Sequence, residues 1–269
     1  AGATAGVLGK TVASPLSRLT ILMQTGGIQG APTDAVGLTR HILRTDGLRG
    51  LMRGNAADIL RQVPYAGSQY IAYENLKQRL SGTGLGKTPE RMISGGLAGA
   101  ASIALTYPLD MVRARMAIQT SDNLKYKSIL HAFRRIYAEE GGEAFYRGCG
   151  TAIAERFPNM AINFGAYELF KSYMNDVGIH GIVASLLCGG LAGIISTTAC
   201  FPLDLIMRNL QTGSGRQTPF QVMRQIYSNS GLRGFYRGLT PQIIKILPYT
   251  CTVWIVYDRC KQFMHFEVR

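Results

Sequence analysis

Charged residues stand at equivalent places within apolar stretches of this 269-residue chain. Three of them, Arg61, Glu155 and Lys245, each lie three residues before a recurring proline, and Lys10 lies five residues before Pro15. A charge within a membrane-spanning helix costs free energy, so such a residue marks a functional group by default. Arginine suits forked contacts with phosphate oxygens, and lysine suits point-charge contacts. The pattern therefore predicts a binding site for a charged molecule.

These positions recur because the whole chain is a threefold repeat. Prolines stand at 15, 108 and 202, and in each case the second glycine of a Gly-x-x-x-Gly pair lies nine residues earlier. A tyrosine-acid-x-x-base pattern recurs after Tyr73, Tyr167 and Tyr257. A repeat of this length holds two long helices and a connecting segment. We expect one domain over 1–269, with repeats of about 1–82, 83–178 and 179–269.

The elements that must position the charged residues are membrane helices. Apolar stretches long enough to cross a bilayer recur, as from Val7 to Met23 and from Ile182 to Phe201. We expect an all-α membrane protein with pseudo-threefold symmetry. Its six tilted transmembrane helices should span about 1–24, 54–80, 90–120, 149–175, 182–212 and 239–265. Short amphipathic helices should lie near 33–44, 127–138 and 218–228. The chain opens inside the first helix without a methionine, so we expect further residues before Ala1.

The chain resembles the mitochondrial carrier family over its whole length. Two motifs carry the resemblance: Pro-x-acid-x-x-base, and acid-Gly-x-x-x-x-aromatic-base-Gly. Repeat two holds both, from Pro108 to Arg113 and from Glu140 to Gly148. The resemblance implies a solute transporter of the mitochondrial inner membrane rather than an enzyme. The scattered histidines and the spacing of the five cysteines predict no catalytic site, metal site or cofactor.

The excess of basic residues predicts orientation. The formal net charge is +13, and many of the bases lie in the three long connections. The positive-inside rule puts these connections on the matrix side, so both termini should face the intermembrane space. Nucleic-acid binding is the other usual meaning of such a charge, but no basic-aromatic motif accompanies it. We expect cardiolipin instead, at the N-termini of the even helices, where a base precedes a glycine. These pairs are Arg53-Gly54, Arg147-Gly148 and Arg237-Gly238.

By the resemblance, the signature acids and bases should form a ring of ion pairs that closes the matrix side. Three substitutions break this ring, namely Ser17 for an acid and Thr20 and Met207 for bases. The residues that lose their partners are Arg113, Asp110 and Asp204.

Nearby residues could replace the lost pairs only in part. Arg18 and Arg208 lie one residue away, about 100° around a helix, and are not expected to substitute. Gln24 and Gln211 stand where the family places a bracing glutamine. We therefore expect the matrix gate to rest on hydrogen bonds and packing.

The resemblance also implies a ring on the cytoplasmic side, which is complete here. The expected pairs are Glu74 with Lys171, Glu168 with Lys261, and Asp258 with Lys77. The alternative is three solvated surface pairs. With three pairs on this side and none of the family pairs on the other, the unliganded protein should be closed to the cytoplasm and open to the matrix.

The cavity residues leave more than one cargo open. By the resemblance, Lys10, Arg61 and Lys245 match the basic triad that nucleotide carriers use for phosphates, so an anionic nucleotide- or coenzyme-like metabolite is the first hypothesis. Glu155 beside Arg156 is more typical of amino-acid carriers. A carrier-fold protein kept as a structural or interaction subunit with little transport activity is the third possibility, and the broken matrix ring is its best support. Structural salt bridges with Glu155 are the alternative to a binding role for the three bases. Protein partners are not predicted.

Overall fold

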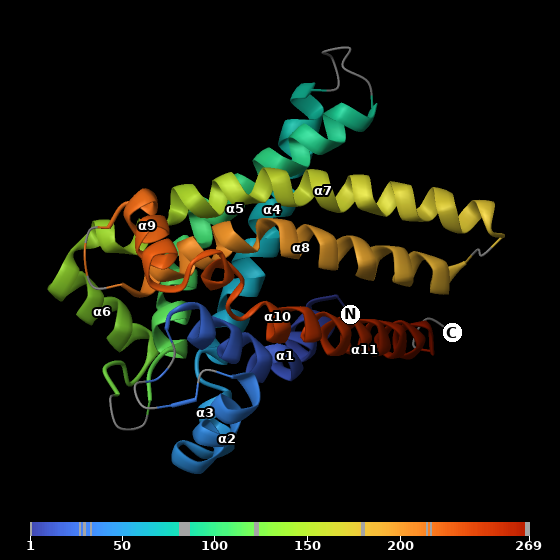
Figure 1. The fold of residues 1–269 in the computed structure, drawn as a ribbon. Coiled ribbons are helices and arrows are strands. Elements are labelled where there is room, and N and C mark those ends of the chain that lie inside the picture. The colour runs from blue at the N-terminus through green and yellow to red at the C-terminus, as the bar shows by residue number, and fades with distance from the viewer. Residues whose placement is uncertain are drawn as a thin grey trace.

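The chain forms three pairs of long helices with short helices between the members of each pair (Figure 1). The computed structural model describes residues 2–26, 28, 31–32, 34–80, 87–120, 124–178, 181–213, 215 and 217–266. Within these ranges, side chains are not described for residues 2, 3, 87–89, 91, 92, 182, 183, 257, 258 and 261–266. The described residues include helices and no strand, in agreement with the all-α prediction.

The odd and even helices keep the predicted order. The first repeat holds α1 (Gly2–Gln24), α2 (Ala35–Thr45), α3 (Gly47–Leu51) and α4 (Asn55–Leu80). The second holds α5 (Lys87–Ala117), α6 (Ile129–Glu140), the 3₁₀ helix η1 (Gly142–Tyr146) and α7 (Cys149–Asp176). The third holds α8 (Ile182–Thr212), α9 (Pro219–Ser230), the 3₁₀ helix η2 (Leu232–Tyr236), α10 (Leu239–Ile244) and α11 (Ile246–Phe266). The sequence did not predict α3, η1 or η2.

The last even helix differs from the prediction of one continuous segment over 239–265. Lys245 separates α10 from α11. Pro248 cannot donate a hydrogen bond to the carbonyl of Ile244, and its ring crowds that carbonyl, so the helix is distorted there. Pro64 and Pro158 stand at equivalent places but lie inside continuous helices. Lys245 keeps helical dihedrals, with φ −60° and ψ −27°, and its N–H and carbonyl still bond to Pro241 and Tyr249, so the helical path continues through it.

We call the end of the bundle where α1, α5 and α8 finish the signature end, and the opposite end the far end. At the signature end each odd helix packs its apolar side chains on the short helix that follows it. Leu19 and Leu22 pack on Leu38 and Ile42 in repeat one. Equivalent clusters join α5 to α6 and α8 to α9. This packing explains the amphipathic pattern of α2, α6 and α9.

Three glycines join neighbouring repeats at the signature end. A Cβ on Gly54 would lie 3.2 Å from the Arg113 carbonyl oxygen, and one on Gly148 would lie 3.3 Å from the Met207 carbonyl oxygen. A Cβ on Gly238 would lie 3.1 Å from the Thr20 carbonyl oxygen, so repeat three closes onto repeat one. All three glycines have positive φ angles, which side chains rarely adopt. The even helices therefore begin in close contact with the next odd helix.

Toward the far end the long helices separate into three groups (Figure 1), in which helices of neighbouring repeats lie side by side: α4 with α5, α7 with α8, and α11 with α1. Gly96 still approaches α7, because a Cβ there would meet Phe157 at 2.8 Å. Gly189 and Gly193 have open space around them, so close packing of this glycine pair is not seen.

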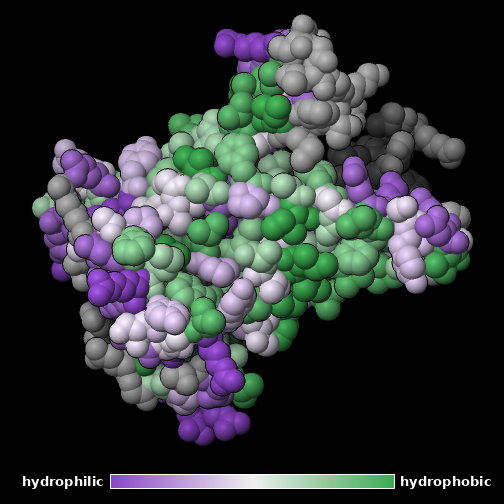
Figure 2. Space-filling view, turned by 45° about the horizontal axis from the view of Figure 1, so that its top comes forward, coloured by the Kyte–Doolittle hydropathy of each residue, from purple (hydrophilic) through white to green (hydrophobic). Residues whose placement is uncertain are grey.

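The surface agrees with a bundle that crosses a membrane. Figure 2 shows apolar side chains over the middle of the visible face and hydrophilic ones gathered toward its ends. Two segments, Ala184–Thr212 and Leu232–Val256, are long and apolar enough to span by length and composition alone. Other long helices carry charged residues on the side that faces the interior, which lowers their mean hydropathy.

Candidate functional site: a charged cavity between the helix pairs

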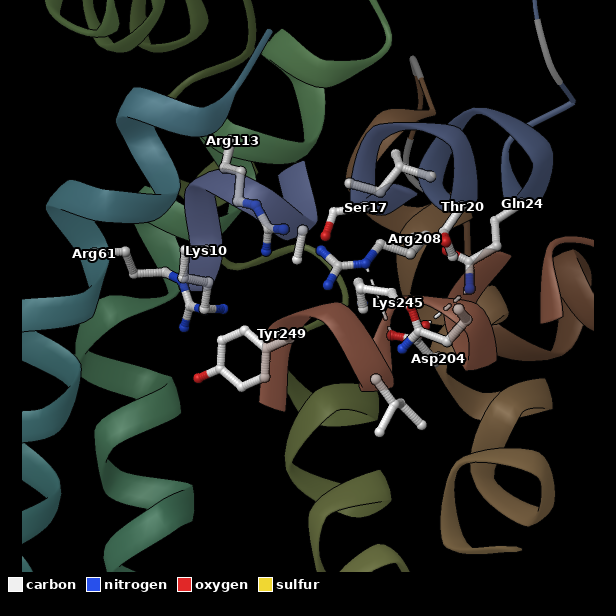
Figure 3. Close-up of a pocket in the computed structure, with 14 residues that line it drawn as sticks. Lys10, Ser17, Thr20, Gln24, Arg61, Arg113, Asp204, Arg208, Lys245 and Tyr249 are labelled. Carbon is white, nitrogen blue, oxygen red and sulfur yellow. Dashed lines mark hydrogen bonds and ion pairs between the residues drawn. The ribbon is translucent and has the colours of Figure 1, made fainter. Parts of the chain in front are cut away.

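The three predicted bases Lys10, Arg61 and Lys245 line one cavity of about 370 Å³ near the signature end. Lys10 comes from α1, Arg61 from α4, and Lys245 from the junction between α10 and α11. Figure 3 shows these side chains with Arg113 and Arg208 around the same space. The repeats have thus brought together five basic residues from all three helix pairs.

A second compartment of about 440 Å³ adjoins the first and shares Lys10, Arg61 and Arg208 with it. Glu155 and Arg156 line this compartment, as predicted for cavity residues. Glu155 accepts a hydrogen bond from the Asn159 amide at 3.0 Å, and no described base forms an ion pair with it. The buried Nε of Arg156 makes no hydrogen bond within the described structure. The Glu155 carboxylate therefore keeps polar atoms available to a cargo, whereas the Nε of Arg156 is buried beside Gly99.

Asp58 is a cavity residue that the sequence analysis missed. It is buried on α4, and its carboxylate lies 3.2 Å from Arg113 and 3.5 Å from both Lys10 and Arg61. Asp58 supplies to Arg113 the acid that Ser17 lacks, from the even helix of the same repeat as Ser17. The signal was available, because Asp58 is the one acid between residues 54 and 73 and stands three residues before Arg61.

The second broken pair is also replaced, which corrects the expectation for Arg208. Arg208 lies 3.1 Å from Asp110, the acid left without a base by Met207. It also lies 3.7 Å from Asp204, four residues earlier on α8. The argument from helix position failed because an arginine side chain is long enough to reach across about 100° of helix surface. Met207 itself is buried against Tyr107.

The third pair is replaced by a neutral donor, as expected. The Gln24 amide donates to Asp204 at 2.8 Å, and the Gln211 amide donates to Asp110 at 3.0 Å. Thr20 does not take part, because its hydroxyl donates to the carbonyl of Leu16. The signature end is thus held by ion pairs as well as by hydrogen bonds and packing, and the expectation of hydrogen bonds and packing alone is wrong.

Arg18 does not substitute in this ring, as the sequence predicted. Its buried guanidinium points away from the cavity and lies 3.5 Å from Asp46. It also donates to the backbone carbonyls of Gly50 and Ala117. This arginine joins α1 to the connecting helices and to the end of α5.

The far end lacks the expected contact between Glu74 and Lys171. In the described part of the structure no ion pair joins them, because the helix groups that carry them have separated. Lys171 instead lies over the Tyr167 ring at 5.6 Å, and Lys77 lies over the Tyr73 ring at 6.0 Å. The remaining partners of this predicted ring, Asp258 and Lys261, have side chains outside the described residues, so the pairs with Lys77 and Glu168 stay predictions.

The structure therefore shows the reverse of the expected gate state. The signature end is closed by contacts among all three repeats, and the far end is open. The expected bias counted only the family's ion pairs, and it omitted Asp58 and Arg208, which restore charge pairing at the signature end.

The fold and cavity define a class: a membrane transporter built from three helix pairs around a central charged site. Comparison with known proteins agrees. The sequence profile described as "Mitochondrial carrier protein" matches residues 1–84, 86–178 and 180–268. The chain therefore belongs to the mitochondrial carrier family, as its signature motifs predicted, and is a mitochondrial membrane protein.

Several members of this family are similar to the chain over nearly its whole length. A mitochondrial adenine nucleotide transporter of Arabidopsis thaliana is 31% identical, covering 100% of this chain and 87% of the relative. Human solute carrier family 25 member 16 is 32% identical, covering 99% of this chain and 88% of the relative. A human mitochondrial adenyl nucleotide antiporter is 32% identical, covering 97% of this chain and 57% of the relative.

Proposed function

We propose that this carrier moves an anionic, nucleotide- or coenzyme-like metabolite across the mitochondrial inner membrane by alternating access. The single observation that carries the proposal is the cavity that Lys10, Arg61 and Lys245 line together. No described carboxylate forms an ion pair with Lys245, whose ammonium donates to Gln242 at 2.6 Å. Phosphate oxygens are the group that best matches such a set of donors. Two relatives named as adenine nucleotide carriers support the same class of cargo.

The two compartments suggest how such a cargo would lie. The basic compartment would hold the phosphates. The neighbouring compartment, with Glu155, Arg156 and Tyr65, would hold the remainder of the molecule. The Glu155 carboxylate can accept hydrogen bonds from sugar hydroxyls or from an exocyclic amine. Glu155 and Arg156 also suit the carboxylate and amine of an amino acid, so an amino-acid cargo remains the second candidate.

Cargo must compete with the internal ion pairs. Asp58 holds Lys10, Arg61 and Arg113 in the closed signature end. Phosphates that bind these bases would replace the carboxylate of Asp58 and free it from α1 and α5. A ligand shifts a conformational equilibrium only through its different affinity for the two states. Exchange of partners around Asp58 is such a difference.

The orientation and lipid contacts belong to the same proposal. The basic connections place the signature end toward the matrix, so both termini face the intermembrane space. Cardiolipin would bind at the N-termini of α4 and α7, because the backbone amides of a first helical turn suit phosphate. Arg53 lies 3.2 Å from Asp46 and Arg147 pairs with Glu140, so these two bases are already engaged within the protein.

Uptake into proteoliposomes tests the proposed cargo. We expect uptake of adenine nucleotides or coenzyme A, and no uptake of amino acids. Arg61→Ala or Lys245→Ala should each lower the rate at least about tenfold, because a hydrogen bond to a charged group contributes about 1.5–3 kcal/mol. Glu155→Gln should change the choice among anions.

The matched control is Lys127→Ala, which removes an exposed lysine outside the cavity and should leave the rate unchanged. Parental rates in both Arg61→Ala and Lys245→Ala would show that the basic residues are structural. Uptake of amino acids alone would establish the second candidate instead.

A further inference from the structure

A separate polar cavity of about 520 Å³ lies at the signature end of repeat three. The ends of α1 and α8, the helix α9 and the segment just after α5 line it. Its polar lining includes Arg237, Ser230, Asn209 and Gln225. Gln24 lines both this space and the transport cavity, but none of the proposed cargo-binding residues lines this space.

The equivalent place in repeats one and two is closed by an acid and a base. Asp46 lies 3.2 Å from Arg53 in repeat one, and Glu140 pairs with Arg147 in repeat two. Both acids stand seven residues before the base, directly ahead of a glycine. Repeat three keeps the base as Arg237 but has Ser230 in place of the acid.

A second arginine is also missing from repeat three. In repeat one Arg18 reaches Asp46 and the carbonyl of Ala117, and in repeat two Arg115 reaches Glu140 and the carbonyl of Gln211. Asn209 takes the place of Arg115 in repeat three and donates to the carbonyl of Gln24 at 3.0 Å. The shorter amide keeps the contact between repeats but fills much less volume. Loss of both an arginine and an acid accounts for the cavity.

Arg237 is left without a counter-charge. Among the described residues no carboxylate lies within ion-pair distance of its guanidinium, which also makes no hydrogen bond there. Its equivalents Arg53 and Arg147 each have a carboxylate. The hydroxyl of Ser230 and the amide of Gln225 add neutral donors around the same space. A positive charge with neutral donors and no acid is the chemistry of an anion site.

We propose that this cavity binds a phosphate-bearing anion through Arg237, in the place that Asp46 and Glu140 occupy in the other repeats. The group is either free phosphate or the phosphate of a lipid headgroup. Because α1, α8 and the segment after α5 all line the cavity, an occupant there stabilises the closed signature end. The site uses none of the residues proposed to bind the transported cargo.

Thermal melting of the full chain in detergent tests the site, with inorganic phosphate and cardiolipin as separate probes. Phosphate can also bind in the transport cavity. We therefore compare the rise in melting temperature caused by each probe in the parental protein with the rise that it causes in Arg237→Gln, and the difference between them reports the site at Arg237. We expect a smaller rise in Arg237→Gln than in the parental protein. Ser230→Glu should show the smaller rise as well, because it supplies the missing carboxylate internally, and it should melt above the parental protein without any anion. Arg233→Gln is the matched control, since Arg233 is an exposed base on η2, which ends directly before Arg237, and it does not line the cavity.

The two probes identify the source of the anion. A selective shift with phosphate alone supports a soluble anion, and one with cardiolipin alone supports a lipid headgroup. Equal shifts in the parental protein, Arg237→Gln and Ser230→Glu with both probes would overturn the site. Should Arg237→Gln not fold, Ser230→Glu and Arg233→Gln still decide the question.

Discussion

At the scale of single residues, Asp58 is the acid that the sequence analysis did not consider, and like Asp110 it pairs with three of the cavity bases. Its carboxylate is within 3.5 Å of Lys10, Arg61 and Arg113, from three different helices. One buried carboxylate thus forms ion pairs with all three bases and compensates their charge. Removal of such an acid leaves uncompensated buried charge, which is strongly destabilising.

Asp58→Asn should therefore lower the stability of the unliganded protein and raise its affinity for anions. Without cargo the variant should melt several degrees below the parental protein, since breaking a buried pair costs about 3–5 kcal/mol. Nucleotide should bind more tightly and restore much of the lost melting temperature, because the freed bases have no internal competitor. Melting curves over a nucleotide titration measure both effects.

Asp176→Asn, an exposed acid at the end of α7, is the control and should match the parental protein. Weaker nucleotide binding by Asp58→Asn than by this control would contradict the role of Asp58 as a competitor for the bases.

At the scale of elements, the connection between α6 and η1 is held by Glu140. Its carboxylate accepts hydrogen bonds from Arg115 and Arg147, and the hydrogen bond from Arg115 is the main cause of a pKa below the ordinary glutamate range. A lowered folded-state pKa gives stability that is present above the unfolded pKa of about 4.3 and is lost as the pH falls through the folded value.

Glu140→Gln should lower the melting temperature at neutral pH by several degrees, because the change leaves two buried donors without a charged acceptor, at about 1–3 kcal/mol. The parental protein should lose stability as the pH falls below about 4.3. The variant should show a shallower decline over that range. Melting temperatures between neutral pH and the acid limit of folding provide the measurement. An equal decline of melting temperature below about pH 4.3 in the two proteins would rule out Glu140 as the titrating group.

At the scale of the whole molecule, the contacts among the repeats lie at the signature end. Ion pairs, glutamine hydrogen bonds and close glycine contacts join the three repeats there, while the long helices separate into three groups at the far end. The unliganded carrier should therefore rest closed at the signature end and open at the far end. This reverses the expectation from the family's ion-pair positions alone.

Single cysteines at Ser17 and Glu74 in a cysteine-free background test this resting state. A membrane-impermeant maleimide should label Glu74→Cys rapidly from the far side and Ser17→Cys slowly from the signature side. Adding Asp58→Asn should speed labelling at Ser17→Cys, because it removes an acid from the closed end. Rapid labelling at Ser17→Cys without that change, with Glu74→Cys protected, would show the opposite resting state.

The sequence alone determined the architecture and the cavity bases. Repeats at a fixed period must form equivalent helix pairs, so equal spacing from Pro64, Pro158 and Pro248 places Arg61, Glu155 and Lys245 at equivalent heights. The apolar pattern likewise predicted α2, α6 and α9, because each must bury one face on an odd helix.

Only the tertiary structure decided which charges pair. Asp58 and Arg208 restore the gate because long side chains reach across helix faces, and position on a helix does not limit them to one partner. The unfilled cavity beside Arg237 depends on packing between repeats. A repeat specifies which positions are equivalent, but the contacts of each position depend on the neighbouring repeat, whose residues differ.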